Sequence, residues 1–134
     1  MIRVFAPLLA ALLLLTGCAR DPDAPPDLRW DHATCAECAM LVSDPGFAAA
    51  LVLKDGTLLP FDDAGCLFKY LVEKAPPVHA MWFHDGEGDR WLREGQVAFL
   101  PGKVSPMGSG LQPVPAGTPG SIGVGEASAR AVAR

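Results

Sequence analysis

Cysteine and methionine side chains form the most reactive short motif of the sequence. Cys35 and Cys38 are separated by two residues, and Met40 follows two positions later. A Cys-x-x-Cys pair alone fits a thiol–disulfide redox pair, half of a zinc site, or a site for a soft metal ion. Thiolate and thioether sulfur together select Cu(I) over zinc or magnesium, so Met40 favours copper. Packing is the alternative for Met40, because Leu41 and Val42 continue as an apolar run.

A second methionine and a third thiol extend this set of soft ligands. Met107 lies in the segment Ser-Pro-Met-Gly-Ser-Gly (105–110), where no neighbour in the sequence would bury it. A methionine in a loop of small residues is a poor core residue and a good ligand. Cys66 is predicted in the first turn of a helix, where a thiol becomes more reactive. We favour a small buried side chain for Cys66, the common fate of free cysteine, and keep it as a possible accessory thiol.

The two alternatives to copper have weaker support from the sequence. A thioredoxin-like site needs its first cysteine at the start of a helix that follows a core strand, whereas Cys35 precedes the first predicted strand. A four-ligand zinc site needs a second ligand pair, and only Cys66 and scattered histidines are present. The histidines are His32, His79 and His84.

Acidic residues and known catalytic motifs do not point to an enzyme. Asp62 and Asp63 could form a metal or acid–base pair, but capping of the helix that follows explains them. The sequence has no Ser-His-Asp order, Gly-rich phosphate loop or HExxH motif. The formal net charge is −4 and there is no basic patch, which argues against a nucleic-acid partner.

The N-terminus has the features of an export signal. Arg3 is followed by an apolar run over 4–15 and by Leu-Thr-Gly-Cys ending at Cys18. The apolar run is shorter than the roughly 20 residues of a transmembrane helix. Leu-Thr-Gly-Cys resembles the bacterial lipobox, which implies a signal peptide over 1–17 and a lipid on Cys18. An ordinary signal peptide is the alternative. Ala19 after the cysteine favours the outer over the inner membrane.

Removal of Cys18 from the thiol count leaves three cysteines, an odd number for an exported protein. Residues 18–31 are rich in proline and aspartate and predict a flexible, solvated tether. Trp30 is the one large aromatic residue of this segment and marks where the tether meets the folded domain, predicted over 32–134.

The folded domain is predicted to be α+β and to begin with a ββαβ unit. Asp55-Gly56 is a two-residue turn signal between apolar runs. The predicted elements are a strand over 47–54, a strand over 57–61, a helix over 64–74 and a strand over 78–84. The helix has an apolar face with helical spacing, formed by Leu67, Phe68, Leu71 and Val72.

A second, shortened β-rich unit of related topology is predicted after residue 89. Its candidate strands are 90–92 and 96–100. The stretch 111–125 is rich in proline and glycine and predicts irregular structure, and 127–134 predicts a short frayed helix.

These motifs together resemble the NosL family of lipoproteins associated with nitrous oxide reductase. The matching features are the lipobox at Cys18, the Cys35-x-x-Cys38-x-Met40 motif, the stretch from Phe47 through Phe61-Asp-Asp-Ala-Gly-Cys66-Leu67, and Pro106-Met-Gly-Ser-Gly110. The resemblance covers about 35–110.

The resemblance implies a periplasm-facing Cu(I) chaperone with an α+β fold of related ββαβ units. It implies delivery of copper for the copper clusters of nitrous oxide reductase, with an ABC-type maturation complex as a partner and no small-molecule substrate. The implied ligands are Cys38, Met40 and Met107, with Cys35 as a further ligand or a disulfide partner. The sequence departs from the family after Gly110, where an apolar strand is replaced by a proline-rich stretch, so the support of the Met107 loop is in question.

Overall fold

The computed structural model describes residue 17 and residues 19–134. The predicted signal peptide, apart from Gly17, and the predicted lipidation site Cys18 lie outside the described residues. Within the described part, no helix combines the length and the hydropathy needed to cross a bilayer.

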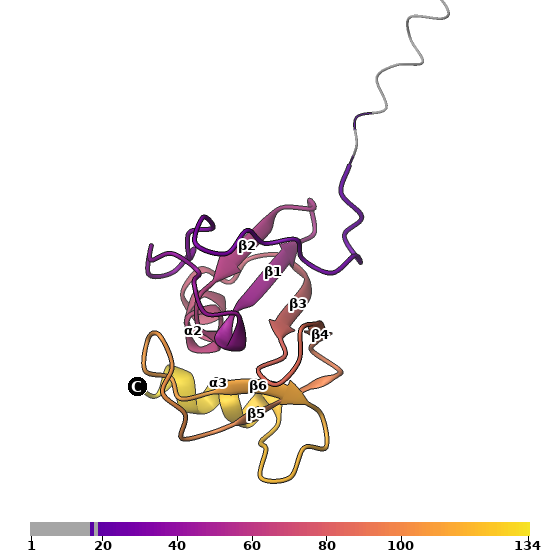
Figure 1. The fold of residues 1–134 in the computed structure, drawn as a ribbon. Helices are drawn as coiled ribbons and strands as arrows, with labels where there is room; N and C mark the ends of the chain where they lie inside the picture. The colour runs from indigo at the N-terminus through magenta and orange to yellow at the C-terminus, as the bar shows by residue number, and fades with distance from the viewer. Residues whose placement is uncertain (1–16, 18) are drawn as a thin grey trace, which may run out of the picture.

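The first unit of the fold is the predicted ββαβ unit (Figure 1). Its elements are β1 (Ala49–Leu53), β2 (Leu58–Phe61), α2 (Ala64–Lys74) and β3 (Val78–His84). The strands are antiparallel in the order β2-β1-β3-β4, and β4 (Trp91–Arg93) closes the sheet beside β3. The predicted strand over 47–54 begins later than expected, because Phe47 ends the short 3-10 helix η2 (Pro45–Phe47).

Helix α2 begins and ends for local reasons that the sequence contains. The Asp63 carboxylate accepts the backbone N–H of Gly65 at 2.7 Å and caps the first turn. Ala75 adopts a left-handed conformation (φ 43°) at the C-terminal end, before two prolines. Leu67 and Phe68 are buried as predicted, whereas Val72 is exposed. The apolar stripe is therefore narrower than the spacing suggested.

Aromatic rings join the first unit to the second. The ring centroids of Phe68 on α2 and Phe83 on β3 are 5.8 Å apart, and Phe99 of the second unit lies 5.7 and 5.1 Å from them. All three rings are buried in one apolar cluster. Because a single core spans both units, the second unit is part of the same domain.

The second unit is more regular than the sequence predicted. It consists of β5 (Val97–Leu100), β6 (Gln112–Pro115) and α3 (Val124–Val132). The prediction of irregular structure over 111–125 was wrong for 112–115, which pair with β5 in antiparallel register. Proline is tolerated here because Pro113 and Pro115 alternate along an edge strand, where the missing N–H groups face away from β5. The carbonyl of Pro113 faces outward accordingly and accepts the N–H of Gly86 at 2.7 Å. The fold is α+β.

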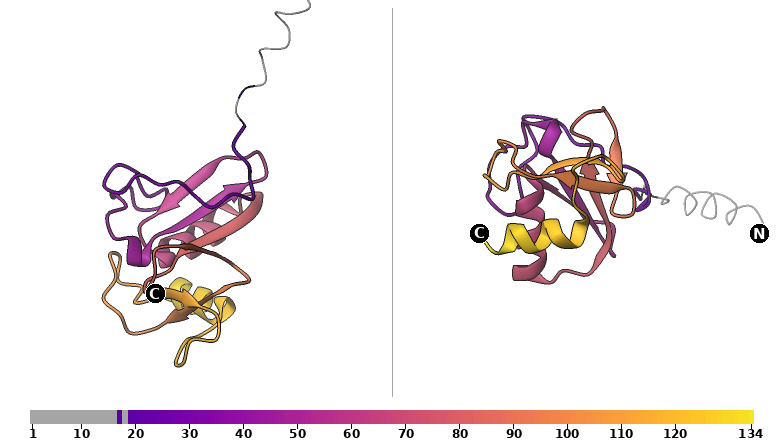
Figure 2. Two further views of the ribbon diagram at one scale, coloured as in Figure 1. Left: turned by 45° about the vertical axis from the view of Figure 1, so that its right-hand side comes forward. Right: turned by 90° about the horizontal axis from the view of Figure 1, so that it is seen from below.

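The N-terminal segment before η2 covers the face of the four-stranded sheet that lies opposite α2 (Figures 1 and 2). That face carries a small apolar cluster, Ala50, Val52, Ala80 and Trp82, which is buried. Trp30 stacks on Trp91 with ring centroids 6.2 Å apart. Contrary to the prediction, it does not mark where the tether meets the fold, because Asp23 already contacts Arg93 at 3.1 Å. Residues 19–31 were predicted to be solvated, but Pro26 is buried, because an apolar sheet face needs cover.

Candidate metal centre

The Cys-x-x-Cys motif forms a tight loop that is fixed against the end of β2. The N–H of Cys35 donates to the carbonyl of Met40 at 2.8 Å, and the N–H of Ala39 donates to the carbonyl of Cys35 at 3.0 Å. Ala39 takes a left-handed conformation (φ 64°) to close the loop. The N–H of Ala36 donates to the carbonyl of Pro60 on β2 at 2.8 Å. These bonds bring both cysteines beside the first residues after β2.

Three thiols and a carboxylate meet at this point. The side-chain ligand atoms of Cys35, Cys38, Cys66 and Asp62 all lie within 4.8 Å of one another. Cys35, Cys66 and Asp62 are buried, whereas Cys38 is partly exposed and its Sγ donates to Asp62 Oδ1 at 3.4 Å. The three cysteines are free thiols. One metal ion placed among them would be within reach of all four side chains.

Cys66 and Asp62 also belong to the cluster. The sequence favours a small buried side chain for Cys66, with a role as accessory thiol as the alternative, and a helix-capping role for Asp62. Cys66 is buried, but it is buried against the other two thiols, and the capping residue is Asp63 alone. The odd number of thiols, in a chain whose N-terminus predicts export, was the one signal in the sequence that pointed to a role for Cys66.

The three thiols differ in their affinity for protons. Hydrogen bonding from Cys66 lowers the pKa of Cys35 to about 6, although burial opposes this shift. The same hydrogen bond, together with burial, raises the pKa of Cys66. Burial raises the pKa of Cys38 to about 11. Cys35 is therefore the first of the three thiols to lose its proton as the pH rises.

The loop that carries Met107 is fastened to the start of α2 by Asp63. Asp63 Oδ2 accepts the hydroxyl of Ser105 at 2.7 Å and the N–H of Met107 at 3.0 Å. Asp63 Oδ1 accepts the hydroxyl of Ser109 as well as the cap bond from Gly65. The Asp63 side chain is fully buried by these contacts. The loop is therefore held at its start by Asp63, and the proline-rich stretch after it forms strand β6.

A pocket of about 300 Å³ opens between the thiol cluster and the Met107 loop. Its wall includes three sulfur-bearing side chains, Cys38, Cys66 and Met107, while Cys35 is not among its lining residues. Lys69 and Arg134 bring positive charge to its lining and Glu37 brings negative charge. The Arg134 guanidinium donates to the carbonyl of Gly108 at 2.7 Å.

The remaining candidate residues lie outside this pocket. Met40 is 54% exposed and does not line it, although it is two residues from Cys38. His79 Nε2 contacts Asp23 at 2.9 Å, and His84 Nε2 contacts Asp89 at 3.3 Å. Neither histidine belongs to the thiol cluster. The arrangement thus offers soft sulfur ligands from three separate parts of the chain, partly open to solvent.

No protein-family model matches the sequence, and no curated protein matches it either. The structure is similar to the crystal structure of the copper chaperone NosL from Shewanella denitrificans, with a TM-score of 0.52 and 18% sequence identity. The match covers 81% of this chain and 88% of that chain. The protein therefore has a NosL-like α+β fold, the fold that its short motifs predicted.

Proposed function

We propose that this protein binds Cu(I) at the thiol cluster and delivers it to a partner protein. The observation that carries the proposal is the meeting of Cys35, Cys38 and Cys66 within 4.8 Å, beside a pocket that Met107 also lines. Thiolate and thioether ligands select Cu(I) among the common biological metals. The similarity to the copper chaperone NosL supports the same choice.

The proposed ligands that line the pocket are Cys38, Cys66 and Met107. The fourth proposed ligand is Cys35, which is buried behind the pocket wall. A carrier must release its metal by ligand exchange, so an open position beside the ion is needed. The partly exposed side of the cluster, at Cys38 and Met107, supplies that position. Met40 remains a predicted ligand, and it would have to turn toward the pocket to reach the ion.

The delivery route is proposed from the sequence motifs. The mature protein would carry a lipid on Cys18 and face the periplasm, anchored in the outer membrane. Its copper would serve the copper centres of nitrous oxide reductase through an ABC-type maturation complex. In cells that lack this protein, we expect the reductase to be made with less copper, and restoration by the wild type but not by Cys38→Ser.

Competition titration with a Cu(I)-specific chelator tests the site. We expect Cys38→Ser, Cys66→Ser and Met107→Leu each to weaken Cu(I) binding at least about tenfold, which corresponds to about 1.4 kcal/mol per lost ligand. Met81→Leu is the control, because Met81 lies in β3 and packs against the core. If Cys38→Ala combined with Met107→Ala binds Cu(I) as tightly as the wild type, the site assignment is wrong.

Thiol–disulfide exchange by Cys35 and Cys38 is the alternative function. Such exchange needs an accessible thiolate to attack the partner. Here the pKa of the partly exposed Cys38 is raised to about 11, and the low-pKa thiol, Cys35, is buried. This distribution argues against thiol–disulfide exchange by the pair. A reversible Cys35–Cys38 disulfide with an oxidising potential that Met107→Leu leaves unchanged would favour the redox function instead.

Zinc is a second candidate metal because three cysteines and Asp62 provide four ligands, the number of a structural zinc site. The effect of replacing Met107 distinguishes zinc from Cu(I) binding, because a thioether is a soft ligand that zinc does not need. Binding of zinc in preference to Cu(I), with no effect of Met107→Leu, would identify a zinc site.

A further inference from the structure

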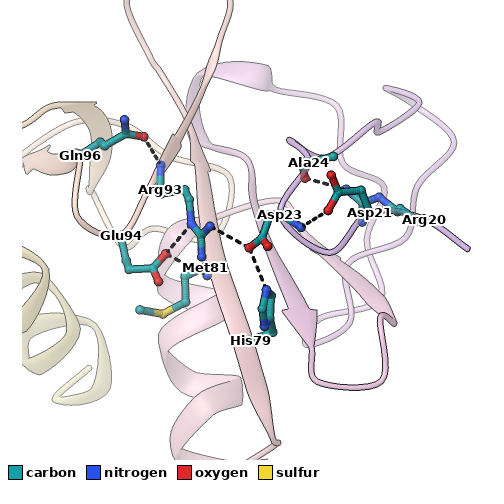
Figure 3. Close-up of polar contacts among 9 residues, drawn as sticks. All are labelled: Arg20, Asp21, Asp23, Ala24, His79, Met81, Arg93, Glu94 and Gln96. Carbon is teal, nitrogen blue, oxygen red and sulfur yellow. Dashed lines mark hydrogen bonds and ion pairs between the residues drawn. The ribbon is translucent and has the colours of Figure 1, made fainter.

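The Asp23 carboxylate joins the segment before the Cys-x-x-Cys loop to the four-stranded sheet (Figure 3). Asp23 Oδ1 accepts from Nε2 of His79 at 2.9 Å and from the guanidinium of Arg93 at 3.1 Å. His79 belongs to β3 and Arg93 to β4, two neighbouring strands. Asp23 is 56 and 70 residues away from these partners in the sequence. The contact therefore joins the predicted tether to the body of the domain.

The receiving side of this contact is held in place by the sheet itself. The Arg93 guanidinium lies 5.3 Å from the centre of the Trp82 ring, a cation–π distance, and its Nε is 3.7 Å from Glu94 Oε2. Glu94 Oε2 in turn accepts the N–H of Met81 at 3.2 Å. A guanidinium fixed in this way loses little further entropy when it binds a carboxylate.

The incoming segment is also shaped for the contact. The N–H of Asp23 donates to Asp21 Oδ1 at 2.9 Å, and the N–H of Ala24 donates to the carbonyl of Asp21 at 3.2 Å. The Arg20 guanidinium donates to the carbonyl of Pro25 at 3.1 Å. These local bonds form a turn that presents the Asp23 carboxylate to β3 and β4.

The contact of Asp23 with the sheet also determines the side on which the N-terminal segment leaves the domain. In Figures 1 and 2 residues 19–23 leave the domain on the side away from the loop over 101–110 and the end of α3. The pocket is lined by Met107 and Arg134, which belong to that opposite side. An anchor attached just before residue 19 would thus lie on the far side of the domain from the pocket.

We propose that the contact of Asp23 with His79 and Arg93 is a latch that sets how far the domain reaches from its lipid anchor and turns the metal pocket away from the membrane. This inference rests on the proposed lipid at Cys18. With the latch closed, the chain from Cys18 to Asp23 advances by five residue steps and spans at most about 18 Å. With the segment released as far as the buried Pro26, it advances by eight residue steps and spans at most about 28 Å.

Two measurements on the lipidated mature protein test the latch. The first is the rate of trypsin cleavage after Arg20 in detergent, where the anchor has no membrane to contact. We expect Asp23→Ala to be cleaved about 3- to 10-fold faster than wild type, the range for loss of two exposed charge-assisted bonds. Asp27→Ala is the matched control, since it removes an equal charge from the same segment and Asp27 is exposed. Equal cleavage of all three proteins would overturn the latch.

The second measurement is energy transfer from tryptophan to a dansyl-labelled phospholipid in vesicles that carry the protein. Trp30, Trp82 and Trp91 are the three tryptophans of the chain, and all lie near the latched segment. We expect lower transfer in Asp23→Ala than in wild type and in Asp27→Ala, because a longer reach moves the domain away. Equal transfer in all three would overturn the effect on reach. A protein with an intact Cys18 that fails to attach to vesicles would overturn the anchor, whereas the trypsin assay would still report on docking.

Discussion

Substitution of Asp63 by alanine is expected to destabilise both the fold and the Met107 loop. The carboxylate accepts four hydrogen bonds: one from the backbone of α2, two from serine hydroxyls and one from the N–H of Met107. Loss of a helix cap costs about 1 kcal/mol. Each of the three loop donors loses a charged acceptor in a partly buried place, at about 1 kcal/mol apiece. The sum is about 4 kcal/mol, a large part of the 5–15 kcal/mol typical of a small domain.

Urea denaturation of the metal-free protein measures this cost, and Asp44→Ala is the matched control. Asp44 caps η2 with the same geometry, accepting the N–H of Gly46 at 2.9 Å, but its carboxylate makes only this exposed bond among the described residues. We expect Asp44→Ala to cost at most about 1 kcal/mol. If Asp63→Ala costs no more than Asp44→Ala, the loop bonds to Asp63 contribute nothing and the reasoning fails.

The same carboxylate links stability to copper affinity. Ser105→Ala is a milder change that removes one loop bond to Asp63 and the bond from the N–H of Gly110 to Ser105 Oγ. In this background we expect Met107→Leu to weaken Cu(I) binding less than it does in wild type, because the loop no longer holds Met107 at the pocket. Purely additive effects of the two substitutions would show that the loop does not position Met107.

Three further predictions follow from single residues. Thiolate absorbance in the metal-free protein should rise with an apparent pKa of about 6, lowered by hydrogen bonding from Cys66. This step should move toward higher pH in Cys66→Ala, which has no donor, and vanish in Cys35→Ser, and a single step near 9 in wild type would contradict it. Gly65→Ala should destabilise the protein by about 1–3 kcal/mol in denaturant unfolding, because the new Cβ would lie 2.5 Å from the Cβ of Ser109. Gly125 occupies the same position in α3 and has open space around it, so Gly125→Ala should stabilise the protein by up to about 1 kcal/mol. Ala39→Gly should raise the free energy of unfolding by about 0.5–1 kcal/mol because Ala39 has a positive φ, and Ala36→Gly in the same loop should lower it.

Local signals in the sequence were sufficient for the first unit of the fold. The Asp-Gly turn, the aspartates before the helix and the paired prolines after it predicted α2 at its observed bounds and β3 as well. These elements are determined by neighbours in the chain. The outward placement of Pro113 and Pro115 in β6 depends instead on which edge of the strand is paired, and that is a tertiary property.

The sequence predicted that sulfur-bearing side chains would gather at one place, but it did not predict all the members of the cluster. Of the four predicted ligands, Cys38 and Met107 line the pocket, whereas Cys35 and Met40 do not. The contribution of Cys66 depends on how the Cys-x-x-Cys loop packs against the end of β2, which spacing along the chain does not reveal. Asp63 was expected only to cap a helix, because its three loop partners come from a segment more than 40 residues away.

A crystal structure of the copper-loaded protein, with anomalous diffraction recorded at the copper edge, tests the central claim most directly. We expect one strong anomalous peak among Cys35, Cys38 and Cys66 on the side of the pocket that faces Met107. A copper peak at Met40 away from this pocket, or at His79 or His84, would contradict the proposed site. The absence of ordered copper while the three thiols stay intact would contradict it as well.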